Sequence, residues 1–154
     1  MNGKKTLLSA CLLLISAALF SQQPNPRYDK AYADSLGADQ YGMKKYVLVI
    51  LKTGSNTMEN KAIADSLFRG HMTNIESMAQ AGKLIVAGPM QKNTKAYRGI
   101  FILDVRTVAE AEALVANDPA IKAKLLDTEY FTWYGSAALP TYLPNHVRLE
   151  KTKP

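Results

Sequence analysis

His71 is the residue of this sequence best suited to acid–base chemistry. An imidazole titrates near neutral pH, so it can accept a proton in one step of a reaction and donate it in another. His71 lies four residues after Leu67 and four before Ile75, which places it on the apolar stripe of an expected helix. The residues alone leave two interpretations open. His71 is either a core histidine whose nitrogens find ordinary hydrogen-bond partners, or a proton shuttle at a site.

Asp118 is the second candidate, and it also has two interpretations. It directly precedes Pro119. An aspartate followed by proline is typical of a helix start, where the carboxylate caps free amides and the proline needs none. A capping carboxylate still has a second oxygen with which it can orient an imidazole. Capping and a functional role are therefore compatible at Asp118.

The other chemistry-bearing residues predict neither a metal nor a cofactor. His146, the only other histidine, lies in a proline-broken tail where a solvated side chain is expected. Cys11 is the single cysteine, which excludes an internal disulfide and a cysteine-type zinc site. The sequence contains no G-x-G-x-x-G motif, no phosphate-binding loop, and no serine or cysteine nucleophile signature.

The apolar pattern predicts the elements that must position these side chains. Strands are expected over residues 45–51, 83–87, 98–104 and 128–134, the second of them stopped by Gly88-Pro89, and helices over residues 61–81 and 107–116, with a further helical start at Asp118-Pro119. The order strand, helix, strand, strand, helix, strand predicts the ferredoxin-like βαββαβ fold of the α+β class. That fold is an antiparallel four-stranded sheet with its helices on one face.

The chain divides into four parts on this pattern. Residues 45–136 form the expected domain. Residues 22–44 before it are expected to be a linker with a short helix that ends at Gly37, and residues 137–154 a peripheral tail. Residues 1–21 have a separate character, described below.

Both faces of the expected sheet are apolar. Val47 and Val49 point to one face, whereas Leu48 and Ile50 point to the other, and the second and third strands repeat this pattern. Two helices cover only one face, and an uncovered patch this apolar is unusual on a monomer. We therefore expect a homodimer that pairs through the sheet face and encloses a pocket between the sheets.

The composition is that of a single globular domain. The chain has 154 residues, of which 47% are hydrophobic and 21% charged, and its formal net charge is +6. This excludes a disordered or fibrous protein. Nucleic-acid binding is not expected in spite of the positive charge. The segment Arg98-Gly99-Ile100-Phe101 begins like an RNA-binding signature but has isoleucine where stacking aromatics should lie.

The first 21 residues have the layout of a secretory signal peptide. Lys4 and Lys5 precede an uncharged apolar run that ends at Phe20 and is followed by polar residues. The run is shorter than the ~20 residues that a membrane-spanning helix needs, which leaves a retained anchor as the minor alternative. Leu8-Ser9-Ala10-Cys11 matches a lipid-attachment pattern, but most of the apolar core follows Cys11, so we interpret that match as chance. A periplasmic or secreted protein with no stable membrane span after cleavage is expected.

Several of these residues, in their order and separation, resemble the YCII-related (YciI-like) family of small dimeric α+β barrel proteins. The resemblance covers about Tyr46 to Trp133 and is carried by His71, Gly82, Ala87-Gly88-Pro89, Asp118-Pro119 and Trp133. It implies that His71 and Asp118 form an active-site pair. It also implies that Gly88, Pro89 and Trp133 contribute to a substrate pocket.

The resemblance extends to proteins of the muconolactone-isomerase and dehydrochlorinase kinds, which act on small ring compounds. It therefore implies a small-molecule enzyme in which His71, held by Asp118, moves a proton on a small cyclic substrate. The alternative is a non-catalytic dimeric module of the cell envelope that binds a small ligand.

The predicted signal peptide can be tested directly. Cleavage after the apolar run should leave a mature chain that begins close to Gln22. Mass spectrometry of the protein isolated from its native cell envelope measures that start. A full-length chain in the cytoplasm would contradict the prediction of export, whereas lipid attached at Cys11 would contradict only the cleavage position.

Overall fold

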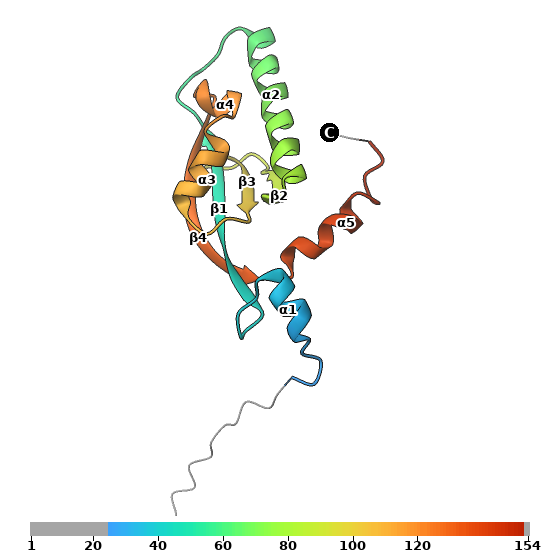
Figure 1. Ribbon diagram of the computed structural model, residues 1–154. Helices are drawn as coiled ribbons and strands as arrows, with labels where there is room; N and C mark the ends of the chain where they lie inside the picture. The colour runs from blue at the N-terminus through green and yellow to red at the C-terminus, as the bar shows by residue number, and fades with distance from the viewer. Residues whose placement is uncertain (1–24, 153–154) are drawn as a thin grey trace, which may run out of the picture.

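A computed structural model describes residues 25–152 as a four-stranded antiparallel sheet packed against helices (Figure 1). The strands are β1 (Met43–Thr53), β2 (Leu84–Pro89), β3 (Tyr97–Leu103) and β4 (Leu126–Ser136), in the spatial order β2-β3-β1-β4. The helices are α1 (Lys30–Leu36), α2 (Lys61–Gln80), α3 (Val108–Val115) and α4 (Pro119–Lys122), followed by η1 (Leu139–Tyr142) and α5 (Leu143–His146). The ferredoxin-like α+β fold expected from the sequence is confirmed.

Local sequence determines where the main helices begin and end. The Asn60 side chain accepts the backbone N–H of Ile63 and so caps α2, and Gly82 adopts a φ of 67° just after that helix. Thr107 and Glu110 form a complete capping box at the start of α3. These ends lie within one or two residues of the ends that the sequence predicted.

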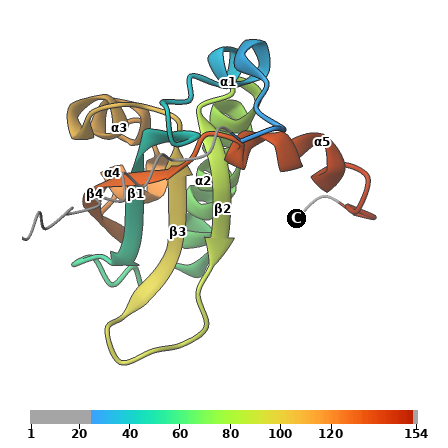
Figure 2. The same cartoon turned by 90° about the horizontal axis from the view of Figure 1, so that it is seen from below.

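The hydrophobic core lies between the sheet and α2, α3 and α4, with α2 crossing one face of the sheet (Figure 2). Val47, Val49 and Leu51 of β1 face this core together with Phe101 and Leu103 of β3. The helices contribute Met78, Ala111, Val115 and Ala120. This face corresponds to one of the two apolar faces predicted from the strands.

The opposite face of the sheet is uncovered in residues 25–152. Leu48 and Ile50 of β1 lie on it and are only half buried. On β4, Phe131 is 47% exposed and Trp133 is 37% exposed, although both are large apolar side chains. Tyr46 is the exception, because its ring packs against Trp133 and its hydroxyl donates to the Ser136 carbonyl.

The second strand continues further than the sequence predicted. Gly88-Pro89 was expected to stop it, but the two residues form its last two positions, paired with Ile100 and Gly99 of β3. The expectation was wrong because β2 is an edge strand. A proline there gives up no ladder hydrogen bond when its nitrogen faces away from the sheet.

The segment after β4 is folded in part. It forms η1 and α5, and α5 lies beyond edge strand β2 in Figure 2. The Tyr142 hydroxyl of η1 donates to the Ile85 carbonyl on β2. No helix in the described part of the chain combines the length and apolar character needed to cross a membrane. The predicted signal peptide and Cys11 lie outside the described residues.

Candidate functional site

His71 is placed by α2 against the middle of the sheet. Its ring stacks on Phe101 of β3 with centroids 6.0 Å apart, and Phe68 approaches it edge-on at 6.3 Å. The residue is only 7% exposed. The apolar stripe therefore turns the imidazole inward, as its spacing from Leu67 and Ile75 predicted.

Asp118 meets His71 from the start of α4. One carboxylate oxygen, Oδ1, caps the helix by accepting the backbone N–H groups of Ala120 and Ile121 at 3.0 and 3.3 Å. The other, Oδ2, lies 2.7 Å from Nδ1 of His71. Asp118 is fully buried. Asp118 thus caps a helix with one oxygen and contacts the imidazole with the other.

Asn74 is a further member of the site that sequence reasoning missed. Its side-chain amide donates to Asp118 Oδ2 at 3.2 Å. Asn74 follows His71 by three residues on α2, so both side chains project from one helix face. That spacing from His71 was the available indication. With Asn74 included, the buried Asp118 carboxylate has four hydrogen-bond partners: two side chains of α2 and two backbone N–H groups of α4.

These donors keep Asp118 ionised. Burial by itself would raise the pKa of this carboxyl group, but the hydrogen bond and charge of His71, with the backbone N–H groups of Ile121 and Ala120, bring the pKa below its usual value. An ionised carboxylate can only accept, so Nδ1 of His71 must carry the proton in this bond. Nε2 is then the ring nitrogen left for proton transfer.

A glycine on α2 allows α4 to approach closely enough for this contact. A Cβ atom added at Gly70 would lie 2.7 Å from Cγ of Pro119, closer than real Cβ contacts allow. Gly70 immediately precedes His71, and Pro119 immediately follows Asp118. The helix-to-helix contact that brings His71 and Asp118 together therefore depends on the absence of a side chain at Gly70.

The other three predicted site residues lie elsewhere. Trp133 pairs with Tyr46 on the sheet face opposite the helices, and Gly88 pairs with Ile100 on that same face. Pro89 ends edge strand β2. The structure thus brings His71 and Asp118 together on the helix side but does not place Gly88, Pro89 or Trp133 beside them.

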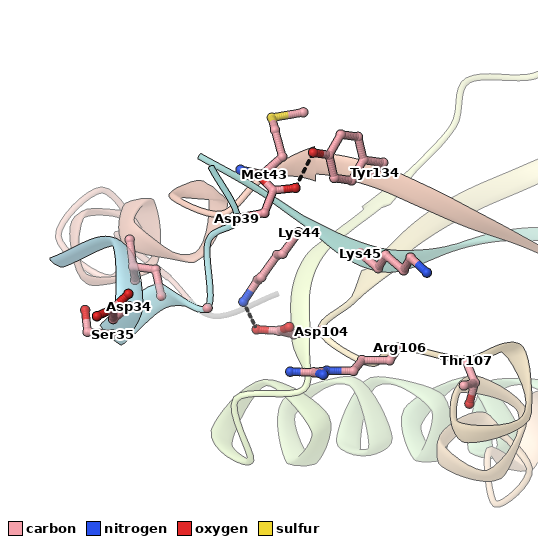
Figure 3. A pocket seen from close by; sticks show the side chains of 12 residues that line it. Asp34, Ser35, Asp39, Met43, Lys44, Lys45, Asp104, Arg106, Thr107 and Tyr134 are labelled. Carbon is pink, nitrogen blue, oxygen red and sulfur yellow. Dashed lines mark hydrogen bonds and ion pairs between the residues drawn. The ribbon is translucent and has the colours of Figure 1, made fainter. Parts of the chain in front are cut away.

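Two of the surface hollows in the described part of the chain have volumes of about 730 and 510 Å³, and neither of these two is lined by His71 or Asp118. The larger one lies at the end of the sheet where β1 begins (Figure 3). Within residues 25–152, no cluster of three or more His, Cys, Asp and Glu side chains could hold a metal ion.

The chain is similar to a known protein family over more than half of its length. The model of the YCII-related domain matches residues 45–134 of the chain. Among solved structures, the chain is similar to 5-chloro-2-hydroxyhydroquinone dehydrochlorinase (TftG) from Burkholderia phenoliruptrix AC1100, determined in complex with 2,5-dihydroxybenzoquinone. The two share 20% sequence identity with a TM-score of 0.42, over 56% of this chain and 92% of that chain. No curated protein matches the chain.

The buried carboxylate yields a prediction about stability. Asp118→Asn replaces one carboxylate oxygen with an NH₂ group, which faces donors instead of acceptors, and leaves the other oxygen uncharged and a weaker acceptor. The free energy of unfolding at pH 7 should fall by about 3 kcal/mol. The matched change Asp127→Asn, at an exposed aspartate of β4, should alter it by less than about 0.5 kcal/mol.

The pH dependence of that difference has a definite sign. Because folding lowers the pKa of Asp118, its charge stabilises the fold above the ordinary aspartate value of 3.8, and this stabilisation is lost as the pH falls through the lowered pKa. Urea unfolding of wild type and Asp118→Asn should therefore give curves that converge below about pH 3.8. A difference that stays constant down to pH 2 would contradict an ionised Asp118.

Proposed function

Because the chain belongs to the YCII-related family, we propose that it is an exported small-molecule enzyme in which His71 and Asp118 transfer a proton. The observation that supports the proposal most is the buried 2.7 Å contact between Nδ1 of His71 and Oδ2 of Asp118. A carboxylate in this position fixes the tautomer of the imidazole and stabilises the imidazolium that forms when Nε2 takes a proton.

The proposed chemistry begins with removal of a C–H proton from a small cyclic substrate by Nε2 of His71. In an isomerisation, the imidazolium returns that proton to a different carbon of the same molecule. In a dehydrochlorination, the C–H electron pair forms a new C=C bond and chloride leaves with the electrons of the C–Cl bond. The imidazolium then releases the proton to solvent. Neither reaction needs an oxidant, a reductant or a metal to balance.

Access of a substrate to His71 requires movement of its neighbours. The residue is 7% exposed and lines neither of the two hollows described above. Phe68 is half buried and stands edge-on to the imidazole, so displacement of its ring would uncover part of it. Gly88 and Trp133 lie on the far sheet face, so we propose that they line a pocket enclosed by a dimer that is separate from the His71–Asp118 pair.

The alternative function is a non-catalytic module that binds a small ligand. The deep burial of His71 favours it, since a histidine satisfied by Asp118 and packed on Phe101 is also a sound core residue. The two functions differ in whether a bound compound is turned over.

Turnover is therefore the test. A panel of lactones and chlorinated hydroxyquinols would be incubated with the protein, with chloride release and isomer formation as readouts. His71→Ala should reduce the rate of any reaction by about 10²–10⁴-fold, because it removes the general base. His146→Ala, at the exposed histidine near the C-terminus, is the matched control and should leave the rate unchanged.

Two outcomes would decide against the catalytic proposal. If the wild-type protein binds compounds of the panel and converts none of them, the binding module is favoured. If it converts one and His71→Ala retains the full rate, the reaction takes place at another site.

We also propose that the uncovered sheet face mediates a homodimer. A standard interface buries about 800 Å² per partner. If half of that area is apolar, its transfer from water contributes roughly 10 kcal/mol per partner before the costs of association. Leu48, Ile50, Phe131 and Trp133 provide such a surface.

Sedimentation should accordingly report about twice the mature mass. Leu48→Asp should produce a monomer, because it buries an unpaired charge in the interface. Ile63→Asp is the matched control: Ile63 is 48% exposed on α2, away from the sheet face, so the dimer should persist. A soluble wild-type monomer at micromolar concentration would contradict the proposal.

A further inference from the structure

The larger hollow, of about 730 Å³, is separate from the His71–Asp118 pair. It lies between α1, the loop that follows α1, the first residues of β1, and the segment after β3 (Figure 3). Lys44, Lys45, Asp104 and Arg106 are among its lining residues. A hollow of this size is large enough for a small metabolite.

One wall of the hollow is made by a segment that precedes the YCII-related domain. Asp34, Asp39 and Met43 belong to this wall and come before residue 45, where the family match begins. The α1 helix has no buried residue, so it adds nothing to the hydrophobic core. Its role in the described structure is to form this wall.

The wall is nevertheless held by specific hydrogen bonds. The Asp39 carboxylate accepts the backbone N–H groups of Tyr41 and Met43 and the hydroxyl of Tyr134 on β4. The hydroxyl of Tyr134 and these amides hold the pKa of Asp39 below its usual value. The backbone N–H of Ala137 donates to the Gly42 carbonyl. The appended segment is thus tied to both β1 and β4 at the mouth of the hollow.

Three acidic side chains and three basic ones line the hollow, and they differ in how they are paired. Each carboxylate has its own partner: Asp34 pairs with Lys30 at 2.6 Å, Asp104 with Lys44 at 2.8 Å, and Asp39 with Tyr134. In residues 25–152, Arg106 and Lys45 make no ion pair with any carboxylate. Arg106 and Lys45 therefore have no carboxylate partner, whereas Asp34 and Asp104 are ion-paired and the ionised Asp39 accepts three hydrogen bonds from neutral donors.

We propose that this hollow binds a small organic anion that carries a carboxylate or a phosphate group. Arg106 contacts the oxyanion, since a guanidinium can donate two parallel hydrogen bonds to carboxylate or phosphate oxygens. Lys45 adds a second positive charge at the hollow. The Lys44–Asp104 ion pair, at 2.8 Å, carries no net charge.

Titration with inorganic phosphate and with succinate tests this site on the mature protein. In ¹H–¹⁵N spectra, the backbone amides of Lys45, Arg106 and Thr107 should shift and saturate with at least one of the two probes. Saturation by phosphate alone assigns a phosphorylated ligand, and saturation by succinate alone assigns a carboxylate. Added NaCl should weaken either, because exposed charges are screened.

Variants that each remove one positive charge identify the side chains that contact the anion. Arg106→Gln should weaken binding at least tenfold and Lys45→Gln severalfold, whereas Lys92→Gln, an equal charge change in the loop between β2 and β3, should leave it unchanged. No side-chain hydrogen bond of Arg106 is present in residues 25–152, so its replacement should not alter the thermal unfolding midpoint. His71→Ala should bind the probe as wild type does, which separates this site from the proposed catalytic one.

Two results would overturn the proposal. The first is the absence of a saturable shift with both probes at 10 mM, a concentration at which sites of about millimolar affinity are well populated. The second is an equal weakening by Arg106→Gln and Lys92→Gln, which would show that only the overall positive charge attracts the anion.

Discussion

A buried carboxylate that must stay charged is the constraint on which the helix side of this protein depends. Asp118 has no exposure to solvent, so every hydrogen bond that water would supply must come from the chain. Two of these bonds come from the first turn of α4, and two come from His71 and Asn74 of α2. The four-residue helix α4 is too short to be stable alone. Its contact with α2 through Gly70 and Pro119 supplies the missing stabilisation and fixes the imidazole at the same time.

The two faces of the sheet differ in how deeply their side chains are buried. The helix face holds the core and the His71–Asp118 pair, and its side chains are fully buried within one chain. The other face presents Phe131 and Trp133 to its surroundings, with Trp133 lying so close over Gly135 that a Cβ atom there would be 2.4 Å from its ring. A glycine at that position lets the indole lie flat along β4. The position of Trp133 on this surface therefore depends on the absence of a side chain at Gly135.

The sequence alone was sufficient for the fold because the relevant information was local. Capping residues such as Asn60 and Thr107, the alternation in β1, and the stripe through His71 each determine an element without knowledge of the rest. Partner contacts between distant elements were less accessible. The bond between His71 and Asp118 was inferred through a family resemblance, because 47 residues separate the two and no spacing rule joins them. The contact of Asn74 with Asp118 was missed for the same reason. The prediction that Gly88-Pro89 stops β2 was wrong because edge position is a property of the assembled sheet. The hollow beside α1 arises only when three separate stretches of the chain meet, so no single stretch of sequence marks it.

The folded tail has a consequence for how molecules of this protein can associate. An edge strand with free carbonyl and amide groups is a template on which another chain can add by main-chain pairing. On β2, the carbonyl of Ile85 is already occupied by the Tyr142 hydroxyl, and Pro89 has no amide hydrogen to offer. Sheet-to-sheet extension along this edge, the geometry from which fibrils grow, is thereby obstructed.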